Sequence, residues 1–215
     1  MIVKSYIPNF ITLLNLFSGC VAVIFALEGN MKLTALFVFL GVFFDFFDGL
    51  LARKLNVQSE LGVQLDSLAD MVTSGLVPGL VLFYLLVLAP PPSWINAELL
   101  PYFGLLVTLA SAYRLANFNI STNQSDAFIG LPTPANTLLI ISLPLILEYQ
   151  NSDAMNTIIL NPWFLIVLTL LSCYLLNAPI KLIALKFKTW NFKDNASRYI
   201  LIVLSVSILA VFQFA

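Results

Sequence analysis

Two pairs of aspartates lie beside the apolar segments of this chain. Asp45 and Asp48 end the apolar run that begins at Leu33, and Asp66 and Asp70 lead into the next run. The members of each pair are three or four residues apart, so on a helix their carboxylates share one face. A carboxylate in or near a bilayer is costly and is rarely placed there without a functional role. These four aspartates are therefore the strongest candidates for chemistry.

Four carboxylates brought together repel one another unless positive charge lies among them. The chain contains no histidine, which excludes a Ser–His–Asp triad and the usual histidine-bearing zinc and haem sites. Oxygen ligands without His or Cys suit Mg²⁺, Mn²⁺ or Ca²⁺. The aspartates thus predict a site for hard divalent cations.

The residues between the two pairs have the types expected of a phosphate site. Gly49 and Gly62 leave room for a bulky ligand to approach the backbone, and Ala52 keeps the same face small. Arg53 offers a planar fork of donors to phosphate oxygens, and Ser59 adds a hydroxyl. Carboxylates that hold divalent cations beside an arginine are recurring parts of phosphoryl-transfer sites. A cation pathway is the alternative, which the guanidinium disfavours because it would repel the permeating ion.

The composition places the whole chain in a membrane. Hydrophobic residues make up 60% of the 215, charged residues make up 10%, and the mean hydropathy is +0.96, whereas a soluble domain carries roughly 25% charge. A spanning helix needs about 20 mostly apolar residues. We predict an all-α, polytopic transmembrane helix bundle that forms a single integral membrane domain over 1–215. The expected spans are about seven, of which the fifth is the shortest: Phe10–Leu27, Leu33–Leu51, Leu68–Ala89, Leu99–Phe118, Ala135–Leu147, Pro162–Ile183 and Tyr199–Phe214.

The basic residues are distributed unevenly between the two sides of the predicted bundle. When the spans alternate in direction, Lys32 alone falls on one side, and the other nine lysines and arginines fall on the opposite side. The positive-inside rule makes the basic side cytoplasmic, so the amino terminus and the aspartates face the cytoplasm. The basic loop 181–198 is expected to set this topology and to attract anionic headgroups, and a substrate role for Lys186 or Lys188 stays open.

The spacing of these residues resembles a known signature. The pattern D-x2-D-G-x2-A-R-x8-G-x3-D-x3-D fixes eight positions over 26 residues and is similar to the signature of the CDP-alcohol phosphotransferases. These are integral membrane enzymes in which an alcohol displaces CMP from a CDP-linked substrate, with a divalent metal. The positions that carry the resemblance are Asp45, Asp48, Gly49, Ala52, Arg53, Gly62, Asp66 and Asp70.

Three further segments resemble one branch of that family, the bacterial CDP-diacylglycerol–serine O-phosphatidyltransferases. They are Pro8–Leu16, Tyr113–Asn119 and Phe128–Pro134. Asn117 and Ala178 depart from the branch, which usually has arginine and serine there. The resemblance implies a six-helix catalytic core with an extra C-terminal helix in the inner cell membrane, and a homodimer. It also implies that CDP-diacylglycerol and L-serine react to give phosphatidylserine and CMP, with membrane lipid as a further partner and no nucleic acid.

Other acceptors remain open at this stage. The same core would serve glycerol 3-phosphate or inositol phosphate. A phosphorylated acceptor would call for additional arginines and lysines near the site, which only Arg114 and the loop between the sixth and seventh spans could supply, and this favours serine. A cation transporter or a membrane scaffold is the remote alternative.

The resemblance also implies a role for each candidate residue. Asp45, Asp48 and Asp66 would be metal ligands for Mg²⁺ or Mn²⁺, with two ions expected. Asp70 would contribute to the metal site and act as the general base, a role that suits a carboxylate because an attacking alcohol must lose its proton and no histidine is present. The nucleotide diphosphate would be bound by Gly49, Ala52, Arg53, Ser59 and Gly62.

Three candidates have an equally plain structural interpretation. Asn9 and Thr12 would cover the cytidine, but Asn9 also suits a helix N-cap, and the Thr12 hydroxyl also suits a bond to its own helix backbone. Arg114 would bind the acceptor's carboxylate or the lipid phosphate, or would extend its charged end to the membrane surface. The segment Gly130–Pro134 has the composition of a turn, and a lid over the site is the second interpretation.

Overall fold

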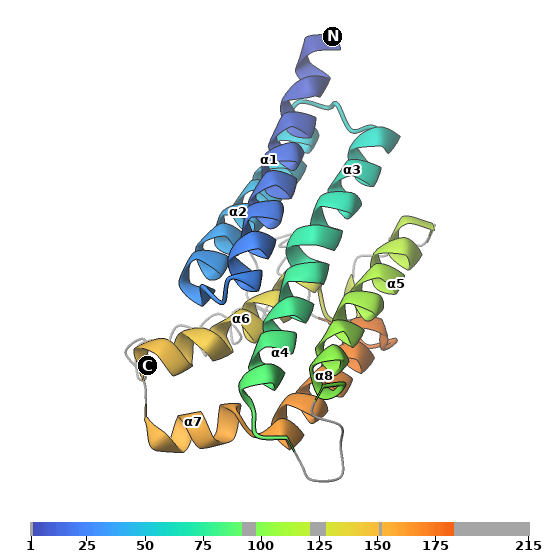
Figure 1. The fold of residues 1–215 in the computed structure, drawn as a ribbon. Coiled ribbons are helices and arrows are strands. Elements are labelled where there is room, and N and C mark those ends of the chain that lie inside the picture. Colours follow the sequence, from blue (N-terminus) through green and yellow to red (C-terminus); the bar gives the residue numbers. More distant parts are fainter. Residues whose placement is uncertain (1, 92–97, 121–127, 151, 183–215) are drawn as a thin grey trace, which may run out of the picture.

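The computed structural model describes residues 2–91, 98–120, 128–150 and 152–182, and the described chain is almost entirely helical (Figure 1). The predicted span Tyr199–Phe214 and most of the basic loop lie outside these residues. The elements are α1 Ile2–Leu27, α2 Met31–Lys54, α3 Glu60–Asp70, the π-helix η1 Met71–Leu76, α4 Val77–Leu88, the 3₁₀ helix η2 Leu100–Leu105, α5 Leu106–Ile120, α6 Thr133–Tyr149, α7 Asp153–Ile159 and α8 Pro162–Asn177, with the short strands β1 Phe128–Ile129 and β2 Lys181–Leu182.

The lengths of the helices confirm a helical membrane protein. Within the described residues, Tyr6–Leu27, Met31–Lys54 and Glu60–Leu88 are each long and apolar enough to cross a bilayer. A fourth span results if α7 and α8, which meet at a bend of 55°, count as one. The predicted spans Leu99–Phe118 and Ala135–Leu147 correspond to shorter helices in the structure. The count of about seven stays a prediction.

Several helix boundaries differ from those expected. The helix α1 begins at Ile2, so Asn9 lies inside it and the N-cap interpretation of Asn9 is wrong. The third span begins at Glu60 because Ser59 caps it, its Oγ accepting a hydrogen bond from the Gly62 N–H at 3.0 Å. The sixth ends at Asn177, before the strand β2, and α7 was not predicted.

The first two helices run antiparallel and side by side along their length (Figure 1). The turn between them is closed by Gly29, whose φ of 75° favours glycine, and by Asn30, whose side chain accepts from the Leu33 N–H. The amino-terminal end of α1 therefore lies beside the carboxyl-terminal end of α2, where Asp45 and Asp48 are. Because only a short connection joins α2 to α3, the same end of the bundle also receives Asp66.

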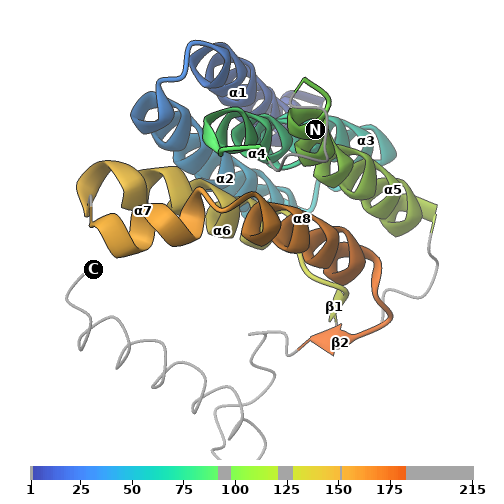
Figure 2. The same cartoon turned by 60° about the horizontal axis from the view of Figure 1, so that its bottom comes forward.

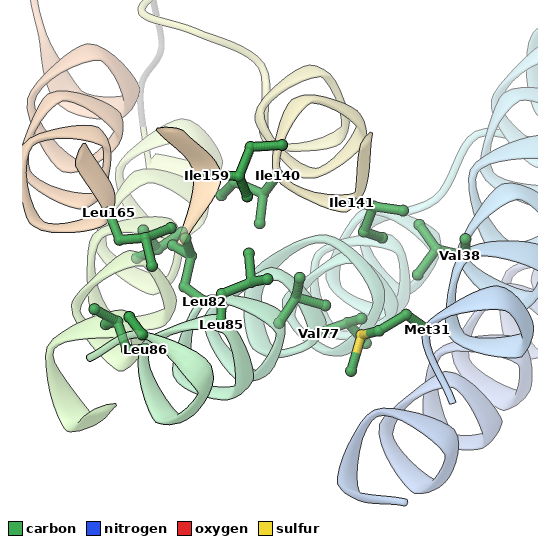
Figure 3. Packing of buried hydrophobic residues seen from close by; sticks show 14 of the residues in the cluster. Met31, Val38, Val77, Leu82, Leu85, Leu86, Ile140, Ile141, Ile159 and Leu165 are labelled. Carbon is green, nitrogen blue, oxygen red and sulfur yellow. The ribbon is translucent and has the colours of Figure 1, made fainter. Parts of the chain in front are cut away.

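Helix α4 supplies the centre of the apolar core. Figure 3 shows side chains of α4, including Val77 and Leu82, between Val38 of α2, Ile141 of α6 and Leu165 of α8, and all five are at most 1% exposed. Close packing of this kind holds helices together in a bilayer, where burial from water contributes little. After α8 the chain continues into β2, which pairs antiparallel with β1 (Figure 2).

The π-helix η1 lies directly after Asp70 and has an identifiable cause. Pro78 has no N–H, so the carbonyl of Ser74 lacks its usual donor four residues on. The hydroxyl of Thr137 on α6 lies 2.8 Å from this carbonyl and 2.9 Å from the Thr133 carbonyl of its own helix, so its one proton can serve the Ser74 carbonyl. The hydroxyl of Thr108 on α5 donates to the Gly75 carbonyl at 3.1 Å. Two neighbouring helices thus satisfy the backbone where the regular helix is interrupted.

Candidate active site

Three of the four aspartates converge. One carboxylate oxygen from each of Asp45, Asp48 and Asp66 lies within 4.8 Å of the other two, with Asp48 buried and the other two half-buried. Among the residues that the structure describes, no lysine or arginine lies at salt-bridge distance from these three. Three hard oxygen donors that converge without a salt bridge in the described part of the chain fit a divalent cation of the Mg²⁺ or Mn²⁺ class. The structure thus brings together three of the four carboxylates for which the sequence predicts a cluster.

Thr12 connects the first helix to this cluster. Its hydroxyl lies within hydrogen-bonding distance of the Pro8 carbonyl, at 3.1 Å, and also of Asp48 Oδ2. The expected bond to its own helix backbone is therefore present, and a contact to a candidate metal ligand accompanies it. Since the carboxylate only accepts, the hydroxyl is the donor and orients Asp48.

Asp70 lies one turn beyond Asp66 and outside the group of three oxygens. It is 9% exposed, and its Oδ1 accepts a hydrogen bond from Asn15 Nδ2 on α1 at 3.4 Å. Asp70 thus has a contact of its own, separate from those of the other three carboxylates. This separation is compatible with one role for Asp70 and another for Asp45, Asp48 and Asp66.

The predicted phosphate-binding residues gather at the same end of the bundle. A Cβ added to Gly49 would have only Arg53 Nη2 near it, at 3.9 Å, so this face of α2 is open. A Cβ added to Gly62 would lie 3.3 Å from both Asn9 Oδ1 and Ser59 Oγ. Asn9, Ser59 and Gly62 therefore meet where α1 passes the start of α3. Ala52 lies half-buried on the last turns of α2.

Comparison with known protein families assigns the chain to a family. Residues 5–174 match the family model described as CDP-alcohol phosphatidyltransferase, which covers most of the chain and every site residue named so far. The chain belongs to this family. This family assignment agrees with the phosphoryl-transfer chemistry that the sequence predicts for the carboxylates on the membrane helices.

Individual relatives share one name. The chain is 36% identical over 143 residues to the CDP-diacylglycerol–serine O-phosphatidyltransferase of Bacillus subtilis, covering 65% of this chain and 75% of that protein. It is 29% identical over 206 residues to the protein of the same name from Helicobacter pylori strain J99, covering 95% and 81%. A yeast protein of this name, from Saccharomyces cerevisiae, is 32% identical over 159 residues, covering 66% and 55%.

Arg114 forms its hydrogen bond away from the aspartate cluster. Its Nη1 donates at 2.8 Å to the carbonyl of Leu176, in the last turn of α8, where helix carbonyls lack backbone partners. Gly130 passes directly beside this contact with a φ of 72°, and its N–H donates to the Ile180 carbonyl at 2.8 Å. The Leu131 N–H ties this segment to α8 by donating to the Leu175 carbonyl at 2.8 Å. The turn expected over Gly130–Pro134 is shorter than predicted, because Thr133 and Pro134 begin α6. Arg114 has a structural bond that the sequence did not predict.

Two further contacts around the aspartates were not predicted. Asn15 and Thr73 form a buried pair beside Asp70. Ser67 donates to Asn119 Oδ1 at 3.0 Å, and Asn119 Nδ2 donates to Gln64 at 3.3 Å, which ties α3 to the end of α5. For Asn15 a signal existed, because it lies three residues after Thr12 and so on the same helix face. For Asn119 no spacing indicated the contact, since α5 is distant in sequence.

Proposed function

We propose that the chain transfers the phosphatidyl group of CDP-diacylglycerol to L-serine and releases CMP. The observation that carries this proposal is the convergence of Asp45, Asp48 and Asp66 at one end of membrane helices, next to the open face at Gly49. The printed name of the relatives, CDP-diacylglycerol–serine O-phosphatidyltransferase, supports serine as the acceptor.

The residues present fit the divalent cation that this chemistry requires. Asp45, Asp48 and Asp66 would hold Mg²⁺ or Mn²⁺, with Asp70 contributing to the site and two ions expected. Bound there, the metal supplies positive charge to the diphosphate oxygens. Arg53 would contact the phosphates from the last turn of α2, and Asn9, Thr12, Ala52, Ser59 and Gly62 would line the nucleotide side.

A side chain of this protein can accept the proton that the serine hydroxyl loses during the transfer. The serine hydroxyl oxygen attacks the phosphorus that bears the diacylglycerol and forms a new P–O bond. The bond from that phosphorus to the oxygen bridging to CMP breaks, and CMP leaves with the electron pair. Asp70 accepts the hydroxyl proton, and the hydrogen bond from Asn15 holds one of its oxygens so that the other is free for this transfer. If the hydrogen bond from Arg114 to the Leu176 carbonyl breaks, the guanidinium would bind the carboxylate of the acceptor.

The membrane setting follows from the charges. We place the amino terminus and the site on the cytoplasmic side of the inner cell membrane, with the tails of CDP-diacylglycerol in the inner leaflet. The reason is that nine of the ten lysines and arginines fall on this side when the predicted spans alternate in direction. The position of Lys32 is consistent with this orientation, because Lys32 lies at the opposite end of α2, where it forms a salt bridge with Glu148 at 2.9 Å. A single domain of about seven spans that forms a homodimer completes the proposal.

The test uses the full chain purified in detergent with CDP-diacylglycerol, Mg²⁺ or Mn²⁺ and radiolabelled serine. We expect label to enter the lipid, EDTA to stop this, and added Mg²⁺ or Mn²⁺ to restore it. The variant Asp70→Asn should lower kcat by about 100-fold or more, the scale of general base catalysis. The matched control Asp153→Asn, at an exposed aspartate on α7 away from the cluster, should keep normal activity.

Other outcomes would change the proposal in defined ways. If serine is inert but glycerol 3-phosphate or inositol phosphate releases CMP, the core mechanism stands and the acceptor is different. If no alcohol releases CMP, the proposed transfer is wrong for this chain.

A further inference from the structure

We infer that Asn15 and Thr73 are positioning residues that set the orientation of the Asp70 carboxylate, an inference that rests on the proposed role of Asp70. The three side chains come from α1, from the π-helix η1 and from the end of α3. Asn15 is fully buried, Thr73 is 1% exposed, and their hydrogen bonds lead to Asp70.

The direction of the hydrogen bonds follows from the groups involved. An ionised carboxylate only accepts, so the end of the Asn15 amide that faces Asp70 is its nitrogen. The amide oxygen then points toward η1 and accepts from the Thr73 hydroxyl at 2.8 Å, a shorter contact than the 3.2 Å to the Asn15 backbone carbonyl. Thr73 therefore holds the amide in the orientation that Asp70 needs.

The surrounding backbone leaves this pair little freedom. A Cβ added to Gly19 of α1 would collide with the Thr73 hydroxyl, and one added to Gly41 of α2 would lie 2.6 Å from Thr73 Cγ2 and 2.9 Å from Asn15 Oδ1. Two glycines thus let α1 and α2 close around Thr73. The π-helix begins at Met71, immediately after Asp70, and carries Thr73 to this contact.

The consequence concerns which oxygen of Asp70 is available. Asn15 occupies Oδ1, so Oδ2 is the oxygen free to accept a proton from an acceptor alcohol. Without the amide, the carboxylate would lose the contact that sets its rotation. Small misplacements of a reacting group are costly in turnover even when substrate binding is unchanged.

The test compares variants close in size to the native residues, in the full chain in detergent, with the acceptor that supports turnover. Thr73→Val removes the hydroxyl and keeps the shape, whereas Thr73→Ser keeps the hydroxyl and loses a methyl group. We expect Thr73→Val and Asn15→Leu to lower kcat by about 10- to 100-fold with little change in KM for CDP-diacylglycerol. Thr73→Ser should retain most of the wild-type kcat.

Two further readouts separate positioning from folding and from metal binding. In Thr73→Val the affinity for Mn²⁺ alone should fall much less than kcat, since Asp45, Asp48 and Asp66 do not contact Thr73 in the described hydrogen-bond network. Because Asn15 Oδ1 loses its hydroxyl donor, the melting temperature should also fall, and kcat is therefore measured at a temperature at which each variant is fully folded. The control Ser18→Ala removes a buried hydroxyl of α1 that bonds only to the Leu14 carbonyl of its own helix at 2.8 Å, and kcat should not change.

The inference is wrong if Thr73→Val and Thr73→Ser have the same kcat, or if the loss in Thr73→Val appears only in KM, in Mn²⁺ affinity or in the melting temperature. Its failure is distinct from that of the proposed function. An inactive Asp70→Asn beside a fully active Thr73→Val refutes the positioning role alone, whereas a fully active Asp70→Asn refutes the role of Asp70 itself.

Discussion

The hydroxyl of Thr12 on α1 donates to Asp48 Oδ2 on α2, so a side chain of the first helix orients a carboxylate of the second. Asp48 is also one of the three aspartates whose oxygens converge. If Asp48 is a metal ligand as proposed, Thr12 is the outer partner that orients it, and such partners strongly affect both metal affinity and activity.

Loss of this donor should weaken metal binding. Thr12→Val keeps the shape of the side chain but removes the hydroxyl, and we expect the affinity for Mn²⁺ to fall by about tenfold or more. Titration of the purified protein with Mn²⁺, followed by electron paramagnetic resonance, measures this. Thr12→Ser retains the hydroxyl and serves as the control. Equal affinities in the two variants would contradict a role for the hydrogen bond.

The open face at Gly49 leads to a second prediction. A Cβ added there meets only Arg53 Nη2, at 3.9 Å, so Gly49→Ala should fold as stably as wild type. If the nucleotide diphosphate approaches this face, the methyl group will obstruct it, and KM for CDP-diacylglycerol should rise about tenfold, or about 1.4 kcal/mol. Steady-state kinetics and a thermal melt together check this. An unchanged KM would place the diphosphate elsewhere.

The contact between Thr137 and the Ser74 carbonyl should matter for stability. Thr137→Val leaves this carbonyl, which Pro78 cannot serve, without its hydroxyl donor, and the free energy of unfolding should fall by about 1–3 kcal/mol. Unfolding in mixed micelles measures the loss. The control is Thr169→Val, because Thr169 is equally buried but its hydroxyl bonds at 2.7 Å only to the Leu165 carbonyl of its own helix. Equal losses would show that η1 does not depend on the α6 hydroxyl.

The turn at Gly130 should not tolerate a side chain. A Cβ there would lie 2.6 Å from the Leu176 carbonyl oxygen and 2.8 Å from Arg114 Nη1, and the φ of 72° is itself unfavourable for alanine. Gly130→Ala should therefore destabilise the protein by about 1–3 kcal/mol. The same micelle unfolding experiment applies, with Gly49→Ala as the comparison that changes a glycine in open space. A Gly130→Ala variant as stable as Gly49→Ala would contradict the geometry described.

Much of the site could be predicted from local spacing. Asp45 and Asp48 share a helix face because they are three residues apart, and Gly49 and Arg53 follow on the same helix, so one short segment carries most of the candidate site. The continuous apolar runs likewise predicted membrane helices. The start of the third helix at Glu60 was missed, although Ser59 is a recognisable cap, because the hydrophobic pattern is weak before Leu68.

The sequence by itself determined the class of protein and the set of candidate acidic ligands, because helical periodicity decides which side chains share a face and hydropathy decides which segments enter lipid. Only the tertiary structure decided that Asn15 and Thr73 meet Asp70, that Thr12 meets Asp48 and that Arg114 bonds to the end of α8. These contacts join helices that are distant in the chain. They depend on how closely the helices approach, which is set by glycines such as Gly19 and Gly41 and by the interruption at Pro78, and periodicity within a single helix carries no information about them.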